Sequence, residues 1–320
     1  MNKIAVFKGI GLHSGSLCIC RVIQNNTPAP HPGIFFKLQD HPFAPLVPAL
    51  HTSVTSTNYS TTLHCLKNPN ASVSTVEHLL SAMYMCNIYD AIVEVEGPEI
   101  PILDGSSLEF IESFRNVGMI RPSNVSSASN VSSASNVSNV SNVSNSSASN
   151  FPFLKVCQPI NVRLENETTG WFLPHVNIAT NTTNQTPRLT LSIDVDFTHR
   201  KLPRRIISAS STDFDFIDQV ASARTFTFKE DYDALVKAGL VGGGSMDNAV
   251  LYENGAPLNT NGLRIEHEHA WHKMLDCVGD LMLAGYPIDG HYHAVKPGHT
   301  LNVAMVKELM SNETNYEICY

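Results

Sequence analysis

The chain has 320 residues, and its composition of 42% apolar and 16% charged residues is typical of a globular protein with about two domains. A net charge of −8 excludes a broad basic surface and therefore a nucleic-acid partner, although a few local Lys or Arg side chains can still hold a small anion. The seven cysteines are odd in number and scattered, and no run of about 18 apolar residues occurs, so we expect intracellular, reduced thiols and no transmembrane segment.

Residues 1–122 are predicted to form a first α+β domain. The expected elements are strands at 3–7, 17–23, 33–38 and 90–96 and helices at 74–86 and 108–117. The first of these helices opens with Ser74-x-x-Glu77, a spacing that indicates a capping box. The Ser/Thr-rich stretch before it, residues 51–65, has no clear periodicity, and no element is predicted there.

Residues 123–150 contain only Ser, Asn, Val and Ala, which predicts a disordered linker because almost nothing in them can be buried. As a flexible coil the linker would reach on the order of 30 Å. It also matches the N-x-S acceptor pattern repeatedly, so one interpretation is a secreted, glycosylated surface protein. The lack of a secretory signal pattern and the unpaired cysteines oppose that interpretation.

Residues 151–320 are predicted to form a second α+β domain. The expected elements are strands at 153–162 and 188–197 and helices at 214–221, 231–238, 271–282 and 301–310. In both halves the strands come first and the helices later. We therefore predict two similar domains, each a sheet with packed helices, that meet helix face to helix face with the active site between them.

The predicted helix at 271–282 carries His272, Asp276 and Asp280 within about 80° of one another, opposite its apolar face. One interpretation is a solvated helix face with a weak i, i+4 pair. The other is a metal site, since His and carboxylate at this spacing can bind one ion. The second interpretation requires a third ligand from elsewhere and a cleft that the polar face lines.

His78 supplies such a ligand, although a partly buried histidine with one backbone partner is the alternative. Together, His78, His272 and Asp276 make the three protein ligands and one open position of a catalytic zinc site, which would also accept Fe²⁺. Glu77, whose alternative role is capping alone, is then placed as general base. Asp280 is expected to orient His299 and keep it cationic by charge pairing.

At these residues the chain resembles the zinc-dependent UDP-3-O-acyl-N-acetylglucosamine deacetylases of lipid A synthesis. The similarity covers the chain outside the Ser/Asn tract and depends on the order and spacing of its motifs. The motifs are GIGLHSG at 9–15, STVEHLLSA at 74–82, EIPILDGSS at 99–107, SARTFTF at 222–228, GGSMDNAVLY at 243–252, GLR at 262–264, HKMLDCVGDL at 272–281 and KPGHTLN at 296–302.

The resemblance implies the same zinc ligands, with Glu77 as base, His299 as the acid that protonates the leaving amine, and Asp280 supporting His299. It further implies that Thr225 hydrogen-bonds the developing oxyanion and that Phe226 packs near the metal. Lys273 would lie in the cleft near polar parts of the substrate, and Lys296 is the expected diphosphate partner. An insert expected near 197–221 would build an apolar passage for the acyl chain.

The predicted function is therefore hydrolytic N-deacetylation of UDP-3-O-acyl-N-acetylglucosamine by a cytoplasmic monomer. The connection between the two domains is normally short in the family, whereas here it includes the long tract at 123–150. This difference suggests an alternative, an organellar location in a eukaryotic source. A second hypothesis is a catalytically inactive homologue that binds a nucleotide sugar or an acyl chain. Because the ligands, base, acid and oxyanion residue are all present, the sequence favours the enzyme.

Overall fold

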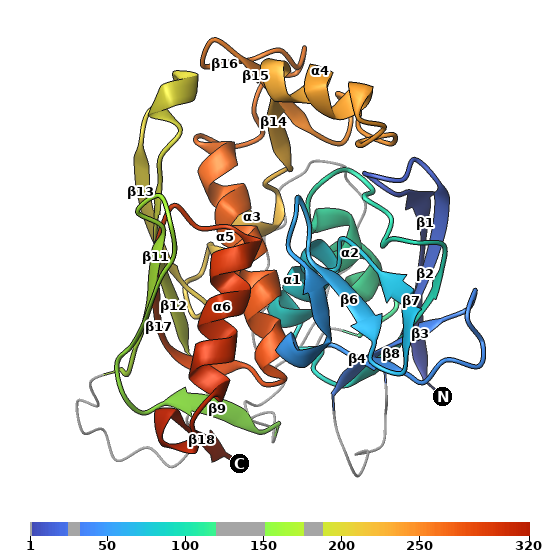
Figure 1. Cartoon of the computed structure of the whole chain (residues 1–320), viewed down its shortest axis with the longest axis vertical. Helices are drawn as coiled ribbons and strands as arrows, with labels where there is room; N and C mark the ends of the chain where they lie inside the picture. The colour runs from blue at the N-terminus through green and yellow to red at the C-terminus, as the bar shows by residue number, and fades with distance from the viewer. Residues whose placement is uncertain (1, 25–32, 120–150, 176–187) are drawn as a thin grey trace, which may run out of the picture.

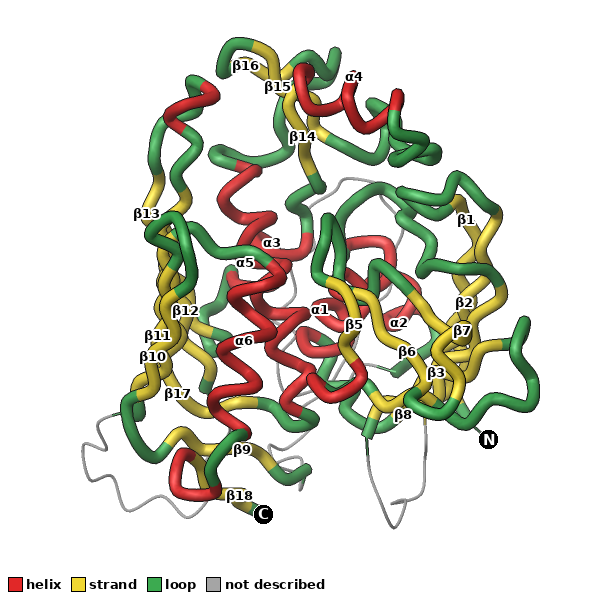
Figure 2. Tube along the Cα trace, viewed as in Figure 1, coloured by secondary structure: helices red, strands yellow, loops and turns green. Residues whose placement is uncertain are grey.

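The computed structural model describes residues 2–24, 33–119, 151–175 and 188–320, and the predicted linker at 123–150 lies outside these ranges. Two sheets form the outer layers of the molecule, and helices fill the space between them (Figure 1). In Figure 2 most of the helices lie in a red central layer with yellow strands on either side, and α4 lies apart at the top. The prediction of two α+β domains that meet through their helices is confirmed.

The first sheet has the strand order β1-β2-β8-β3-β4. Its strands are β1 (Lys3–Ile10), β2 (Leu17–Gln24), β8 (Ala91–Glu96), β3 (Ile34–Leu38) and β4 (Val47–Pro48). Residues of β2 and β8 alternate between buried and partly buried, as strands of a sheet with one covered face do. Its covering helices are α1 (Glu77–Met85) and α2 (Leu108–Asn116), and the short helix η1 (His51–Ser53) follows β4.

The second sheet repeats this topology, with the order β10-β11-β17-β12-β13. Its strands are β10 (Ile160–Arg163), β11 (Thr169–Leu173), β17 (Ile288–Val295), β12 (Leu189–Val195) and β13 (Arg205–Ser210), and β9 (Phe153–Val156) pairs with β17 and with β18 (Tyr316–Cys319). In each sheet a hairpin pairs antiparallel with a late strand, which in turn pairs parallel with an earlier one. The two domains are therefore similar in topology as well as in class.

The second domain contributes the central helices α3 (Phe216–Ala221), α5 (Glu268–Leu281) and α6 (His299–Met310), with the short helices η3 (Thr198–Arg200), η4 (Met282–Ala284) and η5 (Glu313–Asn315). Helix α5 packs directly on α1, and a Cβ atom on Gly279 would lie only 2.0 Å from the Glu77 carbonyl oxygen. Only glycine allows this approach. Because α5 is buried on almost every side, the interpretation of a solvated polar face is wrong.

Two small sheets complete the fold. In the first domain the Ser/Thr-rich stretch contains β5 (Val54–Ser56) and β6 (Thr62–Cys65), and β6 also pairs with β7 (Asn68–Val73), which follows the stretch. In the second, β14 (Phe226–Phe228), β15 (Val250–Glu253) and β16 (Ala256–Pro257) form a unit with α4 (Lys229–Lys237) at the top of Figure 1. Within the described residues, no helix is long and apolar enough to cross a membrane.

Two local predictions are wrong. Helix α1 begins at Glu77 with Val76 as its N-cap, so Ser74-x-x-Glu77 is not a capping box. The Ser74 hydroxyl instead bonds the Thr62 hydroxyl at 3.0 Å, and the Glu77 carboxylate faces the domain interface. The strand expected at 153–162 is two strands, because Pro159 lacks the N–H that a continuous ladder needs.

Candidate metal and acid–base site

Three side chains from the two central helices converge where α1 packs on α5. His78 comes from the first turn of α1, and His272 and Asp276 come from one face of α5. Asp276 Oδ1 lies 3.4 Å from His272 Nε2 and 3.8 Å from His78 Nε2. The three possible ligand atoms all lie within 4.8 Å of one another, and all three residues are buried. The i, i+4 spacing and the helix contact thus bring the predicted ligands together.

Each of the three side chains is in a state suited to a cation. The Nδ1–H of His272 donates to the Ala223 carbonyl oxygen at 3.0 Å, which leaves the Nε2 lone pair directed towards Asp276. Burial and the neighbouring His272 lower the pKa of His78 to about 3, so its imidazole is neutral. Burial alone would raise the pKa of Asp276, but Lys273 and His272 outweigh burial and hold that pKa far below the ordinary value.

One buried atom supports occupation by a metal. Asp276 Oδ2 accepts from Lys273 Nζ at 2.8 Å, whereas Oδ1 has no hydrogen-bond partner among the described residues. An unpartnered carboxylate oxygen is costly in a buried site unless a cation binds there. Two neutral imidazoles and a carboxylate oxygen are a donor set that fits zinc with one open position, and Fe²⁺ is compatible with it. The residues present therefore fit the predicted ion.

A second constellation lies beside the first and joins His299, Asp280 and Glu77. His299, the first residue of α6, has Nδ1 at 2.9 Å from Asp280 Oδ2. Burial alone would lower the pKa of His299, but Asp280 and Glu77 raise it to about 9. The histidine is therefore cationic at neutral pH, and its Nε2 lies 3.9 Å from Glu77 Oε1.

Glu77 is 2% exposed, and its Oε2 accepts the backbone N–H of Thr61 at 3.0 Å. Burial raises its pKa to about 8, and the nearby Asp280 acts in the same direction while His299 opposes it. The pKa of a carboxyl group and that of an imidazole are thus both raised well above their ordinary values. Such displaced pairs are typical of acid–base sites.

Both constellations open into one cavity of about 710 Å³. Thr225, Phe226 and Lys273 also line it. The Phe226 ring meets the His272 ring edge-on, with centroids 6.1 Å apart. Thr225 is fixed through its backbone, since its N–H donates to the Gly105 carbonyl and its carbonyl accepts from the Val250 N–H, both at 2.7 Å. The structure therefore brings all of the predicted site residues except Asp280 and Lys296 to this cavity, and Asp280 is buried behind His299, with which it pairs.

Lys296 lies in a neighbouring groove of about 990 Å³ that also reaches His299. Its ammonium group pairs with Glu167 Oε2 at 3.1 Å. Arg163 lines the same groove and adds a second cation. Glu165 also lines the groove, which therefore presents two cations and one carboxylate next to His299, and none of His78, His272 and Asp276 is among the described residues that line it.

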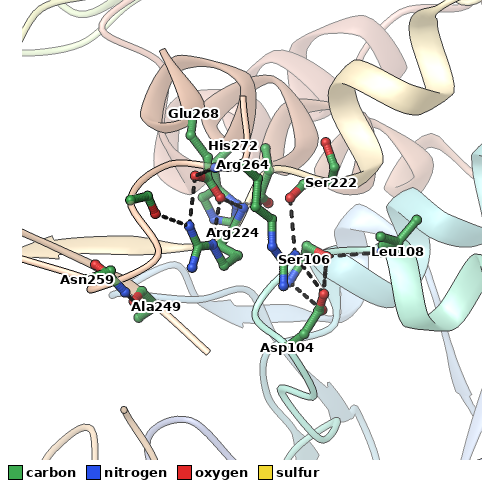
Figure 3. A network of polar contacts seen from close by, with 12 residues as sticks. Asp104, Ser106, Leu108, Ser222, Arg224, Ala249, Asn259, Arg264, Glu268 and His272 are labelled. Atoms are coloured by element: carbon green, nitrogen blue, oxygen red, sulfur yellow. Dashed lines mark hydrogen bonds and ion pairs between the residues drawn. The ribbon is translucent and has the colours of Figure 1, made fainter. Parts of the chain in front are cut away.

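A network of charged side chains holds the segment before β14 against α5, as Figure 3 shows. Glu268 accepts from the Arg224 N–H at 3.0 Å and from its Nε at 2.8 Å, and both residues are buried. Arg264 Nη1 reaches across the domain interface to Asp104 Oδ2 at 2.7 Å. These contacts hold Arg224 in place and so fix its two neighbours, Ala223 and Thr225. The Ala223 carbonyl orients His272.

The range 197–221, where an insert with an apolar passage is predicted, forms regular elements of the second domain. That range contains η3, β13 and α3, and β13 pairs with β12 along its whole length as part of the main sheet. An apolar cavity of about 190 Å³ is lined by residues of 225–251 together with Leu12, His13 and Tyr59. It shares Thr225 and Phe226 with the larger cavity.

Sequence reasoning missed Thr61 and Asn302. The Thr61 hydroxyl donates to Asp280 Oδ1 at 2.6 Å, and Asn302 Nδ2 donates to Asp280 Oδ2 at 2.8 Å. Asn302 stands three residues after His299 on α6, and this i, i+3 spacing was a usable signal. Thr61 stands in a run of similar Ser and Thr residues, where nothing local distinguishes it.

Comparison with known proteins gives matches along almost the whole chain. A family model described as "LpxC: UDP-3-O-acyl N-acetylglycosamine deacetylase" matches residues 1–170 and 130–311. The UDP-3-O-acyl-N-acetylglucosamine deacetylase of Legionella pneumophila (strain Corby) is 32% identical over 100% of this chain and 91% of its own length. The proteins of that name from Geobacter sp. (strain M21) and Geotalea uraniireducens (strain Rf4) are 32% and 34% identical over 99% and 97% of this chain, and over 90% and 87% of their own lengths.

Proposed function

The chain belongs to the UDP-3-O-acyl N-acetylglycosamine deacetylase family, and on that premise we propose that it hydrolyses the N-acetyl group of UDP-3-O-acyl-N-acetylglucosamine. Acetate and the free amine are the products, and the reaction belongs to lipid A synthesis. One observation supports this proposal most strongly. Glu77 Oε1 and His299 Nε2, a base and an acid, lie 3.9 Å apart and open into the cavity that also holds His78, His272 and Asp276.

His78, His272 and Asp276 would hold Zn²⁺ or Fe²⁺. A divalent ion there would supply Lewis acidity towards water and the acetyl carbonyl, and its charge would lower the pKa of nearby Glu77. Lys273 keeps Asp276 ionised through its 2.8 Å contact, and the Ala223 carbonyl keeps His272 in the tautomer with a free Nε2.

Glu77 would take a proton from the attacking water as the new carbon–oxygen bond forms. Thr225 would donate a hydrogen bond to the oxygen that gains negative charge. As the carbon–nitrogen bond breaks, His299 would deliver the proton on its Nε2 to the leaving amine. Asp280 accepts from Nδ1, so Nε2 is the ring nitrogen left to face the substrate.

The apolar cavity and the groove with Lys296 would bind the remaining parts of the substrate. The apolar cavity beside Phe226 suits the acyl chain, because Leu235, Val241, Met246 and Leu251 line it. The groove with Lys296 and Arg163 suits the diphosphate. The apolar cavity shares Thr225 and Phe226 with the central cavity, and the groove shares His299 with it, so one substrate can occupy all three places with its amide between Glu77 and His299.

The test is an acetate-release assay on this substrate, paired with metal analysis of the purified protein. We expect bound metal near one ion per chain and acetate release that stops when a chelator removes the ion. Full activity of a metal-free preparation would contradict the proposed ligands. Tight substrate binding without acetate release would instead identify an inactive homologue.

A further inference from the structure

One residue outside the predicted set contacts both parts of the acid–base arrangement. Thr61 stands directly before β6, and none of its surface is exposed. Its backbone N–H donates to Glu77 Oε2 at 3.0 Å, and its hydroxyl donates to Asp280 Oδ1 at 2.6 Å. Glu77 belongs to the first domain and Asp280 to the second. Thr61 therefore joins the base to the carboxylate that pairs with the acid, across the domain interface.

The Thr61 hydroxyl fixes the orientation of the Asp280 carboxylate. Asp280 Oδ1 accepts from Thr61, while Oδ2 accepts from His299 Nδ1 at 2.9 Å and from Asn302 Nδ2 at 2.8 Å. With both oxygens held, the carboxylate cannot rotate about its Cβ–Cγ bond without breaking a charge-assisted hydrogen bond. His299 consequently keeps its Nε2 directed towards Glu77 and the cavity.

Asn302 is itself held in place, which leaves Thr61 as the link to the first domain. The Tyr292 hydroxyl donates to Asn302 Oδ1 at 2.8 Å, and the Cys277 thiol lies 3.5 Å from the same oxygen. All of these partners belong to the second domain. Among the hydrogen-bond partners of the Asp280 side chain in the described residues, only the Thr61 hydroxyl comes from the domain that carries Glu77.

Thr61 does not touch the substrate space. Glu77 and His299 line the 710 Å³ cavity, whereas Thr61 is not among the described residues that line it. A buried hydroxyl with no face on the cavity acts only through the groups that it holds. Its loss should therefore change turnover and leave substrate binding and metal binding intact.

We propose that Thr61 is a positioning residue that sets the base and the acid at a fixed separation through its contacts with Glu77 and Asp280. This inference rests on the proposed function, because Glu77 and His299 act as base and acid only if the site performs hydrolysis. Small errors in such a geometry reduce rates strongly, since proton transfers require close approach.

The experiment compares Thr61→Val with Thr61→Ser in the metal-loaded full chain. Valine keeps the shape and the backbone N–H but removes the hydroxyl, whereas serine keeps the hydroxyl. We expect Thr61→Val to lose about ten- to a hundredfold in kcat, the rate equivalent of one hydrogen bond to a charged group. KM and metal content should stay unchanged, and Thr61→Ser should restore kcat to within about threefold of the wild type.

Thr62→Val is the matched control, because Thr62 is the next residue and its hydroxyl bonds Ser74 at 3.0 Å, away from the site. It should leave kcat unchanged. If Thr61→Val does not fold, Thr61→Ser and Thr61→Ala carry the same comparison, since they differ only by the hydroxyl. The positioning role of Thr61 is overturned if kcat is the same with and without the hydroxyl, or if the variant loses metal in step with kcat. In either case acetate release by the wild type still upholds the proposed function. A wild-type protein that releases no acetate overturns both.

Discussion

His299 Nδ1 lies 2.9 Å from Asp280 Oδ2, and the Asp280 carboxylate is completely buried. Burial would deprotonate an isolated histidine, yet the pKa of His299 is raised to about 9 because two carboxylates face it. The pair is therefore what converts a buried imidazole into an acid that keeps its proton at neutral pH.

The pH profile of Asp280→Asn follows from this relationship. His299 must be protonated to act as an acid, so wild-type kcat/KM should fall as the pH rises through about 9. Replacing the carboxylate by an amide removes the nearest negative charge and lowers the pKa of His299. The alkaline limb of kcat/KM should move to lower pH, and an unchanged limb would show that another group is the acid.

His78→Ala should lose both metal and activity, because it removes one of three ligands. Metal analysis after dialysis and acetate release measure the two effects. His293→Ala is the control, since His293 lies on β17 against Trp171, with ring centroids 5.2 Å apart, and is not one of the clustered ligands. Retention of a full equivalent of metal by His78→Ala would remove this residue from the ligand set.

Glu268→Ala tests the network of Figure 3. The change leaves the Arg224 guanidinium buried without its carboxylate, and breaking such a pair typically costs about 3–5 kcal/mol. The free energy of unfolding in urea gives the effect. Glu96→Ala is the control and should cost far less, because the Arg21–Glu96 pair lies at the surface. Equal losses in the two variants would show that the buried pair has no special weight.

Gly279→Ala should separate the two domains slightly where their helices meet. The new methyl group would lie 2.0 Å from the Glu77 carbonyl oxygen, and α1 must move to relieve the overlap. We expect a loss of about 1–3 kcal/mol of stability, as for other overpacked interiors, together with weaker metal binding. Thermal unfolding and metal titration check this, and wild-type metal affinity in the variant would contradict the packing described.

The sequence predicted those parts of the fold and site that depend on local patterns. Alternating residues identified β1, β2 and β8, and the 3.6-residue period identified α1, α2, α5 and α6. It missed β17, whose outward positions are Asp289, His291 and His293 and whose inward Gly290 adds no apolar signal. It also missed β5 to β7, where Ser and Thr hide the alternation.

Site residues in local sequence patterns were likewise predicted, whereas those that only the fold brings together were missed. His272, Asp276 and Asp280 were found because one helix spaces them, and Glu77 and His78 because they are adjacent. Thr61 meets Asp280 across 219 positions of sequence, so only the packed structure reveals their contact. The apolar cavity has no compact signal in the sequence, because its lining is spread over 225–251 and includes Leu12, His13 and Tyr59.

The central claim is that Glu77 is the base of a metal-dependent deacetylase, and Glu77→Gln tests it most directly. The amide keeps the size of the side chain but cannot accept a proton, while the three metal ligands are unchanged. Acetate release from UDP-3-O-acyl-N-acetylglucosamine and metal content should be measured on the same preparations of wild type and variant. We predict a full metal content and a rate lower by about 10²- to 10⁴-fold. A metal-loaded Glu77→Gln protein that releases acetate at the wild-type rate would contradict the account.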